Sequence, residues 1–428
     1  MKVKPVSKKL QYYSNYFLFT LLIFALSCGN SKRLSNQNLS LLYNTDQTFL
    51  QPQYSLFHFS KDSSRFYFQI AESNLLFKRN TENIFEANVV LKFELLPSYQ
   101  DITVLDSGTV ELSFKKDSLA MEYNGFVNFK MHLYTQAVLK ITFHDLNRNQ
   151  THVAVLRVVK KTLQSSQFYL LKNDRGEILF HNILSPDERF SFQNNLTDAN
   201  NLKVRYYHRN FPLAAPPFHI GDLPVFDYRA DSVFDLHVNS NSSITFSNPG
   251  IYHLLTDTIT KAGLTILIFK DDFPTPASAE QLIESLRYLT TRQEHDDLLQ
   301  SADPKKAVDE YWMQRAGNPD RARKLIREYY TRVQEANRLF TSYLEGWKTD
   351  RGMIYIVFGP PQTIYRNDKE EQWNYGGANN LPDLSFVFEH VNNPFSYEDF
   401  NLIRTPNNET TWYMAVDEWR NGRVVNEY

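Results

Sequence analysis

The stretch that decides the fold runs from position 345 to 361 and reads EGWKTDRGMIYIVFGPP. It follows a long helical pattern, and Gly346 can take the left-handed conformation that ends a helix. Asp350-Arg351-Gly352 is a turn signal, and the apolar, β-rich run from Met353 to Phe358 predicts a buried strand. Gly359-Pro360-Pro361 then ends that strand, because proline cannot donate to a ladder. The stretch therefore predicts a helix, a tight turn and a strand in immediate succession.

The sequence around this stretch alternates between helical and strand-like patterns. Apolar residues recur at helical spacing over residues 278–289 and 303–315. A third helix is expected to start with Asn318 as its cap and Pro319 at its first position, and to continue to Gly346. Strands are expected at 353–358, 371–375, 384–389 and 411–414. Residues 274–428 therefore read as an α+β domain with long helices and a small sheet.

The same stretch resembles the signature of the GWxTD domain family, which occurs mainly in envelope proteins of Bacteroidetes-type bacteria. Residues 372–376 (QWNYG) resemble the second block of the family, and residues 384–389 resemble its next strand. The matching positions are Gly346, Trp347, Thr349, Asp350, Arg351, Gly352, Gly359, Pro360, Pro361, Trp373, Tyr375 and Gly376. The resemblance covers roughly residues 277–428 and has no established biochemical activity attached to it. The resemblance therefore implies a fold and a cellular location, but no reaction.

Two β-rich segments precede this domain. Residues 49–162 contain β-branched and aromatic runs separated by short turn clusters, without a helical period. Residues 163–273 show the same pattern of β-branched and aromatic runs, and some of the expected strands resemble those of immunoglobulin-like modules. The pattern predicts two antiparallel β-sandwiches. Because Phe273-Pro274-Thr275-Pro276 is a stiff break, the sandwiches are expected to unfold separately from the C-terminal domain.

The N-terminus has the features of a bacterial lipoprotein signal. Four lysines precede an apolar run from Tyr16 to Leu26, which is too short to span a bilayer as a stable helix. The run ends in Ala25-Leu26-Ser27-Cys28-Gly29, which resembles a lipobox. Residues 1–27 are therefore expected to be removed and Cys28 to be lipidated. A plain secretory peptide with an incidental cysteine is the alternative.

The segment after the cysteine predicts how the protein sits at the membrane. Residues 28–48 are polar and rich in Asn and Ser, which predicts a tether between the lipid and the fold. Lys32 and Arg33 make the segment basic, whereas some surface-exported lipoproteins of this bacterial group carry an acidic signal there. We therefore expect a lipid-anchored protein of the outer membrane that faces the periplasm.

Composition excludes several classes of function. The formal net charge of −2 and the pI near 6.6 argue against a general nucleic-acid partner. Cys28 is the only cysteine, so an intrachain disulfide is impossible. The sequence has no HExxH, GxSxG, GxGxxG or Walker-type phosphate loop. We predict no cofactor, no metal and no catalytic residue.

Three polar groupings have competing interpretations. Residues 294–297 (EHDD) could ligate a cation, but on a helix they point in different directions and suit a solvated helix end. One helix carries a strongly basic set, interleaved with Glu328 and Glu335, which favours an ion-paired exposed face over an anion site. That set is Arg321, Arg323, Lys324, Arg327, Arg332 and Arg338. His152 and His253 lie in strand patterns and are expected to be packing or surface residues.

The signature itself can be a binding site or a structural corner. In the structural interpretation Trp347 fills the core, and Thr349 and Asp350 bond backbone groups at the helix end and turn. Trp373, Tyr375, Trp412 and Trp419 are expected to line the same small sheet as a core or a groove.

Two functions compete on this basis. The first is a non-enzymatic scaffold or adaptor that binds another envelope protein. The second is a cell-wall or glycan-acting enzyme, with acid and base among Asp350, Glu371 and Glu389, or a carbohydrate-binding protein with its site at this corner.

Overall fold

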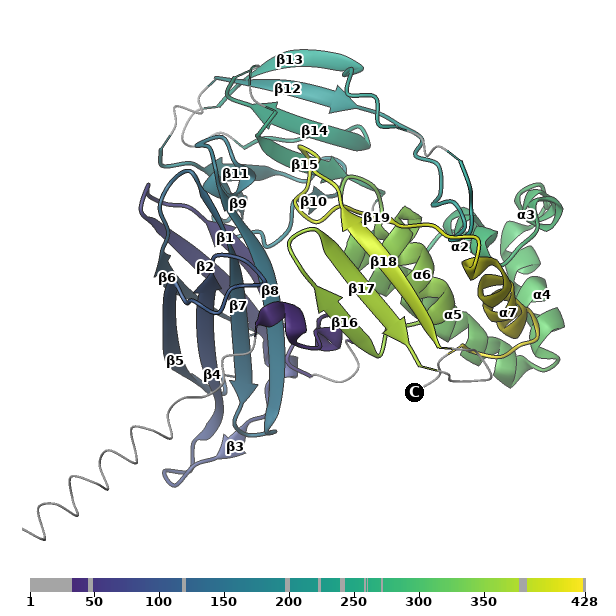
Figure 1. Ribbon diagram of the computed structural model, residues 1–428, viewed down its shortest axis with the longest axis horizontal. Helices are drawn as coiled ribbons and strands as arrows, with labels where there is room; N and C mark the ends of the chain where they lie inside the picture. The colour runs from purple at the N-terminus through teal and green to yellow at the C-terminus, as the bar shows by residue number, and fades with distance from the viewer. Residues whose placement is uncertain are drawn as a thin grey trace, which may run out of the picture.

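The computed structural model describes residues 33–44, 49–117, 121–196, 201–221, 225–238, 243–257, 259, 261–270, 272–376 and 383–425. The predicted signal peptide and Cys28 lie outside the described residues, as do residues 45–48 of the predicted tether. Figure 1 shows two β-rich regions followed by a region of helices and a small sheet, all packed against one another.

The first β-rich region consists of two antiparallel sheets around one core. One sheet has the order β1-β2-β6, and the other contains β4 with β3, β5 and β7 as its neighbours and β8 beyond β7. Phe66, Phe68 and Ile70 alternate along β2 and meet Leu91 and Phe143 of the opposite sheet. This arrangement agrees with the predicted antiparallel sandwich. The strands are β1 (Gln53–Phe57), β2 (Ser63–Ala71), β3 (Lys78–Arg79), β4 (Phe85–Leu96), β5 (Asp106–Lys115), β6 (Glu122–Lys130), β7 (Thr135–Asp145) and β8 (Gln150–Lys160).

The second β-rich region departs from the predicted antiparallel sandwich. Its main sheet has the order β10-β15-β14-β12-β13, with β10 parallel to β15, and a two-stranded pair of β9 and β11 shares its core. The run Leu264–Ile268 is buried along its whole length because the other face of β15 is covered by the C-terminal region. The strands are β9 (Leu170–Asn173), β10 (Ile183–Leu184), β11 (Phe190–Gln193), β12 (Asn201–Tyr207), β13 (Ser232–His237), β14 (Gly250–Leu255) and β15 (Leu264–Ile268).

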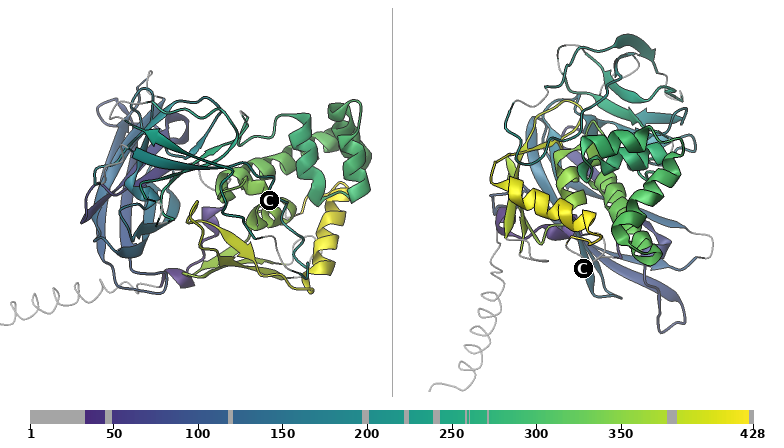
Figure 2. Two further views of the ribbon diagram at one scale, coloured as in Figure 1. Left: turned by 90° about the horizontal axis from the view of Figure 1, so that it is seen from above. Right: turned by 90° about the vertical axis from the view of Figure 1, so that its right-hand side faces the viewer.

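The C-terminal region combines helices with an antiparallel sheet of order β16-β17-β18-β19. In Figure 1 the helices α5 and α6 lie behind this sheet, and Figure 2 shows the helices gathered on the side away from the first β-rich region. The helices are α2 (Ala279–Ser285), α3 (Arg292–Leu299), α4 (Pro304–Ala316), α5 (Pro319–Phe340), α6 (Asp350–Phe358) and α7 (Asn408–Arg420). The strands are β16 (Thr363–Arg366), β17 (Glu370–Tyr375), β18 (Leu384–His390) and β19 (Phe400–Leu402). The predicted helices over 278–289 and 303–315 and the strands over 371–375 and 384–389 are confirmed.

Two predicted strands are helices. Residues 353–358 form most of α6, in which all nine residues are buried. A helix without a polar face shows no helical period, so its short apolar run has the appearance of a buried strand. Residues 411–414 belong to α7, whose buried Thr411, Trp412, Ala415, Val416 and Trp419 follow helical spacing.

Gly346 does not end the long helix in a left-handed conformation. The helix α5 stops at Phe340, and Gly346 begins a short 3₁₀-helix, Gly346–Lys348. A Cβ at Gly346 would lie 1.9 Å from the carbonyl oxygen of Ala336, and a Cβ at Gly352 would lie 1.9 Å from the carbonyl oxygen of Gly346. The two glycines therefore let three backbone segments come into contact.

The described part of the predicted tether is part of the fold. We call residues 33–44 the docked segment; it lies between β8 and β16 (Figure 1). Leu34, Leu39 and Tyr43 are buried in the same core cluster as α5, α6 and the C-terminal sheet. The amide of Leu39 donates to the carbonyl of Ile364 over 2.9 Å, which satisfies a backbone group at the sheet edge. A tether was expected because the segment is mostly polar, but Leu34, Leu39 and Tyr43 are buried, and the half-buried Leu42 packs against the same cluster.

The regions share cores instead of meeting only at a proline linker. The cluster that holds the docked segment also contains Leu96, Tyr99, Val138 and Val155 of the first β-rich region. Phe395 of the C-terminal region joins Tyr207, Ile251 and Leu267 of the second. We therefore expect one cooperative unfolding transition, in place of the separate transitions predicted from the sequence. Among the residues described, no helix is both long enough and apolar enough to cross a membrane.

Candidate functional site

Trp347 fills the space between α5 and the 3₁₀-helix that follows α2. It is 6% exposed, and its ring meets that of Tyr288 edge-on at 6.3 Å between centroids. Its backbone is also held, since its amide donates to Asn337 Oδ1 (3.0 Å) and its carbonyl accepts from the Tyr288 hydroxyl (2.9 Å). Trp347 is therefore a core residue of the connection between α5 and the start of α6 (residues 341–350), which we call the signature corner.

Thr349 is the N-cap of α6. Its hydroxyl accepts from the amide of Gly352 (3.0 Å) and donates to the carbonyl of Gly346 (2.7 Å). This bond satisfies one of the amides that the start of a helix leaves free. The predicted capping role of Thr349 is thus observed, although the element it caps is a helix and not a turn before a strand.

Asp350 bonds a distant part of the chain and not its own turn. Its carboxylate forms an ion pair with Arg404, and both side chains are 8% exposed. The same carboxylate accepts from the amide of Leu402 over 2.7 Å, which fixes the end of β19 against the start of α6. The buried Asp350 carboxylate therefore links the start of α6 to the end of β19.

Arg351 lies in a second buried cluster, centred on Glu371 of β17. Glu371 is fully buried and accepts hydrogen bonds from the hydroxyl of Tyr43 (3.0 Å) and from Trp373 Nε1 (2.7 Å). The guanidinium groups of Arg351 and Arg366 lie 3.7 and 3.3 Å from its oxygens. Tyr43 reaches this cluster from the docked segment, where burial and then the charge of Glu371 raise the pKa of its hydroxyl well above the usual range.

The remaining signature residues determine how α6 ends and how the chain continues into the sheet. Gly359 has a φ of 81°, which favours glycine, and a Cβ there would lie 3.0 Å from the Arg332 guanidinium. Its carbonyl accepts from the hydroxyl of Tyr375 (2.9 Å), and Pro360 and Pro361 then prevent the helix from continuing. Gly376 donates its amide to Gln362 Oε1 over 2.8 Å at the end of β17.

The aromatic residues expected to gather at the small sheet are divided between two positions. Trp373 and Tyr375 are buried on β17, and Trp412 is buried on α7 against Phe358. Trp419 packs edge-on against Tyr329 of α5 at 5.4 Å. All four are core residues and do not line a groove.

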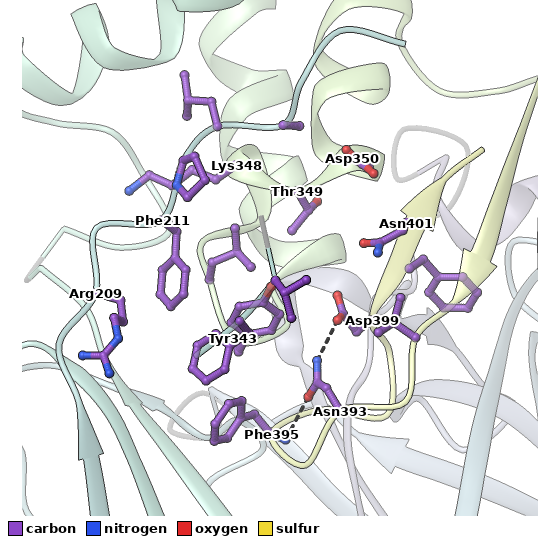
Figure 3. Close-up of a pocket in the computed structure, with 18 of the residues that line it drawn as sticks. Arg209, Phe211, Tyr343, Lys348, Thr349, Asp350, Asn393, Phe395, Asp399 and Asn401 are labelled. Carbon is purple, nitrogen blue, oxygen red and sulfur yellow. Dashed lines mark hydrogen bonds between the residues drawn. The ribbon is translucent and has the colours of Figure 1, made fainter. Parts of the chain in front are cut away.

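A cavity of about 510 Å³ lies beside the signature corner. Its walls come from residues 209–215 and 225–228 of the second β-rich region, from residues 343–344 and 348–350, and from residues of the β18–β19 loop, β19 and Arg404. Figure 3 shows Thr349, Asp350, Asn401 and Asp399 on one side of it, and Arg209, Phe211 and Lys348 on the other. At this cavity the signature residues Thr349 and Asp350 meet an open space.

The other candidate clusters have structural partners. Glu294 pairs with Arg420 (2.7 Å) and Arg315 (3.1 Å), and the hydrogen bond from Arg420 lowers its pKa to about 2. Arg332, expected on an exposed face, is 5% exposed and donates to the carbonyl of Val425 (2.6 Å). His253 is buried between Thr265 and the Lys261 carbonyl, as expected for a packing residue. In the described part of the chain, no cluster of three or more His, Cys, Asp or Glu could hold a metal ion.

The structure also adds residues that sequence reasoning missed. Tyr43, Arg404 and Asp399 each contact or lie beside the signature corner, but they are distant from it in the sequence. The one local signal was in the docked segment, where Leu39, Leu41, Leu42 and Tyr43 form a short apolar run after polar residues.

Replacing Tyr43 with phenylalanine tests the docked segment. The ring volume stays, but Glu371 loses a buried donor, so we expect a loss of about 1–3 kcal/mol of unfolding free energy. Urea denaturation of the full chain measures this change. Tyr365→Phe, on the partly exposed face of β16, is the matched control and should change stability by less than about 0.5 kcal/mol. Equal stabilities for the two variants would contradict the role of the Tyr43 hydroxyl.

Comparison with known proteins supports the resemblance noted in the sequence. The model of the GWxTD domain family matches residues 250–421, which include β14 and β15 as well as the C-terminal helices and sheet. None of the curated proteins compared with the chain matches it. The chain is thus a GWxTD domain-containing protein, with that domain in residues 250–421.

Proposed function

We propose that the protein is a non-enzymatic, outer-membrane-anchored periplasmic lipoprotein that acts as a scaffold or adaptor in a cell-envelope protein assembly. The observation that carries this proposal is that the polar side chains of the signature are used inside the fold. Thr349 caps α6, Asp350 pairs with Arg404, and Arg351 lies in the cluster around Glu371. Groups held in this way position other parts of the chain and are not available for proton transfer.

The carboxylates considered for acid–base catalysis do not form a pair. Glu371 pairs in register with Phe388, whereas Glu389 pairs with Glu370. Successive residues of a strand point to opposite faces, so Glu371 and Glu389 lie on opposite faces of the sheet. Glu371 is buried and Glu389 is exposed. This geometry favours the scaffold over the glycan-acting enzyme.

The docked segment supports the anchored arrangement. It begins at Arg33, five positions after Cys28, and reaches the core of the GWxTD domain at Tyr43. A lipid at Cys28 would therefore hold the GWxTD domain close to the membrane, rather than at the end of a long flexible linker. In this proposal the first β-rich region is an immunoglobulin-like module, and both β-rich regions enlarge the surface available to an envelope protein partner.

A carbohydrate-binding protein, or a glycan-acting enzyme, is the second candidate. It is favoured by the aromatic rings of Phe211, Tyr343 and Phe395 in the same cavity as Asn393 and Asn401. Rings and amides together are suited to sugars. A release of reducing ends from purified cell-wall glycan by the wild-type protein would favour this candidate.

Affinity capture tests the scaffold. The tagged lipoprotein is crosslinked mildly in cells and purified beside an untagged control strain. We expect a protein partner at fixed stoichiometry, and no glycan cleavage by the purified protein. A protein that captures no partner and cleaves glycan would overturn the proposal.

Replacing Cys28 with alanine tests the anchor. Without the thiol, no lipid can be attached, so we expect an unlipidated precursor that is lost from the outer-membrane fraction. Membrane fractionation and mass spectrometry of the N-terminus measure the outcome. Ser31→Ala, outside the lipobox-like sequence, is the control and should partition like wild type. An unlipidated wild-type protein that fractionates equally with the membrane would contradict the proposed anchor.

A further inference from the structure

The charges of the cavity beside the signature corner are paired with one exception. Three cations line it, and each has a carboxylate partner: Arg209 with Asp231, Lys348 with Glu345, and Arg404 with Asp350. The lining residue Asp227 pairs with Arg229 over 2.8 Å. The remaining charged residue of the lining is Asp399, and none of the ion pairs formed by the described residues includes it.

Asp399 is a buried carboxylate without a cationic partner. It is 7% exposed, and Asn393 Nδ2 donates to its Oδ2 over 2.7 Å. Burial raises the pKa of its carboxyl group, although the bond from Asn393 and the charge of Arg351 act in the opposite direction. A buried carboxylate without a cationic partner is unfavourable unless it takes up a proton or a counter-ion arrives.

The aromatic walls lie close to this carboxylate. Burial and then the charge of Asp399 raise the pKa of both Tyr343 and Tyr228. The rings of Tyr343 and Phe395 are 6.1 Å apart, and that of Phe211 lies 5.2 Å from Tyr343. Figure 3 shows Tyr343, Phe395, Asn393 and Asp399 grouped at one end of the cavity. Ring faces attract a cation, and the attraction grows where water is excluded.

The β18–β19 loop holds these groups in place. Asn393 Oδ1 accepts from the amides of Phe395 (2.8 Å) and Ser396 (2.9 Å), while its Nδ2 donates to Asp399. Phe395 in turn is buried against Tyr207 and Ile251 of the second β-rich region. Asn393 thus positions both the carboxylate and one of the rings before any ligand binds.

We propose that this cavity binds a primary ammonium group, with Asp399 as its counter-ion and Tyr343 and Phe395 beside it, and that a lysine side chain of a protein partner supplies the group. An anion would meet Asp399 while the lining cations are already paired, and a neutral ligand would leave Asp399 uncompensated. The source of the ammonium group rests on the proposed scaffold function, whereas the charge of the ligand follows from the cavity.

A pair of matched peptides tests the inference with the full-length protein in detergent. The first probe is acetyl-Gly-Lys-Gly-amide, and the second carries norleucine, which has a similar apolar chain but no charge. We expect saturable binding of the lysine peptide by calorimetry, and binding of the norleucine peptide that is at least about tenfold weaker. Equal binding of the two peptides, or binding of neither, would overturn the inference.

Two variants separate the proposed counter-ion from general surface charge. Asp399→Asn removes the charge but keeps an oxygen that accepts from Asn393, and it should weaken lysine-peptide binding by at least about tenfold. Asp227→Asn removes a more exposed carboxylate from the same lining and should leave binding unchanged. If both variants weaken binding equally, Asp399 has no special role. If Asp399→Asn fails to fold, the same comparison is made on the wild type with an acetyl-lysine peptide, which should not bind.

The source of the ammonium group is tested by a second ligand. Glucosamine carries a primary ammonium group on a sugar, and saturable binding of glucosamine without binding of the lysine peptide would overturn the assignment to a protein partner. Failure of the scaffold proposal is a different result, because it requires that crosslinked cells give no stoichiometric partner. If the protein binds the lysine peptide but captures no partner in cells, the ammonium site is supported and the scaffold function is contradicted.

Discussion

Replacing Trp347 with alanine is expected to lower the free energy of unfolding of the full chain by about 3–5 kcal/mol. Trp347 is 6% exposed and packs against Tyr288, and the cavity left by its ring is closed in by α5 and α6. The backbone bonds to Asn337 and Tyr288 survive the substitution, so the surrounding chain has little freedom to collapse into the space.

The measurement is urea denaturation, followed by both tryptophan fluorescence and far-ultraviolet circular dichroism. Because the regions share cores, we expect the two signals to shift together to a lower midpoint with an unchanged slope. Met313→Ala, on the exposed side of α4, is the control and should change stability by less than about 0.5 kcal/mol. A Trp347→Ala protein as stable as this control would show that the ring is not part of the core.

The elements that could be predicted from the sequence are those with strong local signals. The cap Asn318 and Pro319 mark the start of α5, and the alternating apolar residues of β2 mark a half-buried strand. In each case the pattern of a single element carries the information, because one face of that element is buried and the other is not. The first β-rich region and the helices α2, α4 and α5 follow from such signals.

The helix α6 could not be predicted because its surroundings remove the signal. Its residues are buried on every side, between α5, the docked segment and the sheet, so no polar face reveals a period. The observation that decides its conformation is the bond from Gly352 to the hydroxyl of Thr349, which caps a helix. Thr349 stands directly before Asp350 in the sequence, and that pair is itself a helix-start signal that the apolar run outweighed.

The site could not be predicted because its partners are distant in sequence. Tyr43 donates to Glu371, which is 328 positions away, and the charge of Asp399 acts on Tyr228 of the second β-rich region. Residues 33–44 contain a short apolar run from Leu39 to Tyr43, interrupted by Ser40, but nothing local shows which distant elements this run packs against. Its burial depends on contacts with both the first β-rich region and the C-terminal sheet, which are distant from it in the sequence.

Asp350→Asn is the substitution for which the structure changes the expectation most. If Asp350 were only a cap, asparagine would replace it without loss, because an amide still accepts a hydrogen bond. In the fold, however, its carboxylate pairs with Arg404, and both groups are buried. Asparagine keeps an acceptor for the amide of Leu402 but leaves the guanidinium without its charge partner. We therefore expect a loss of about 3–5 kcal/mol, the range for breaking a buried ion pair from one side.

A double-mutant cycle on the full chain measures this pair. Asp350→Asn and Arg404→Gln are each compared with wild type and with the double variant by urea denaturation. We expect the double variant to be more stable than the sum of the single losses implies, because it leaves no buried charge unpaired. Asp320→Asn breaks an exposed pair with Arg323 and should change stability by less than about 0.5 kcal/mol. An Asp350→Asn protein as stable as that control would mean that the buried pair contributes nothing. If such a protein were stable but had lost partner capture, Asp350 would act in binding or catalysis and not as the tie between α6 and β19.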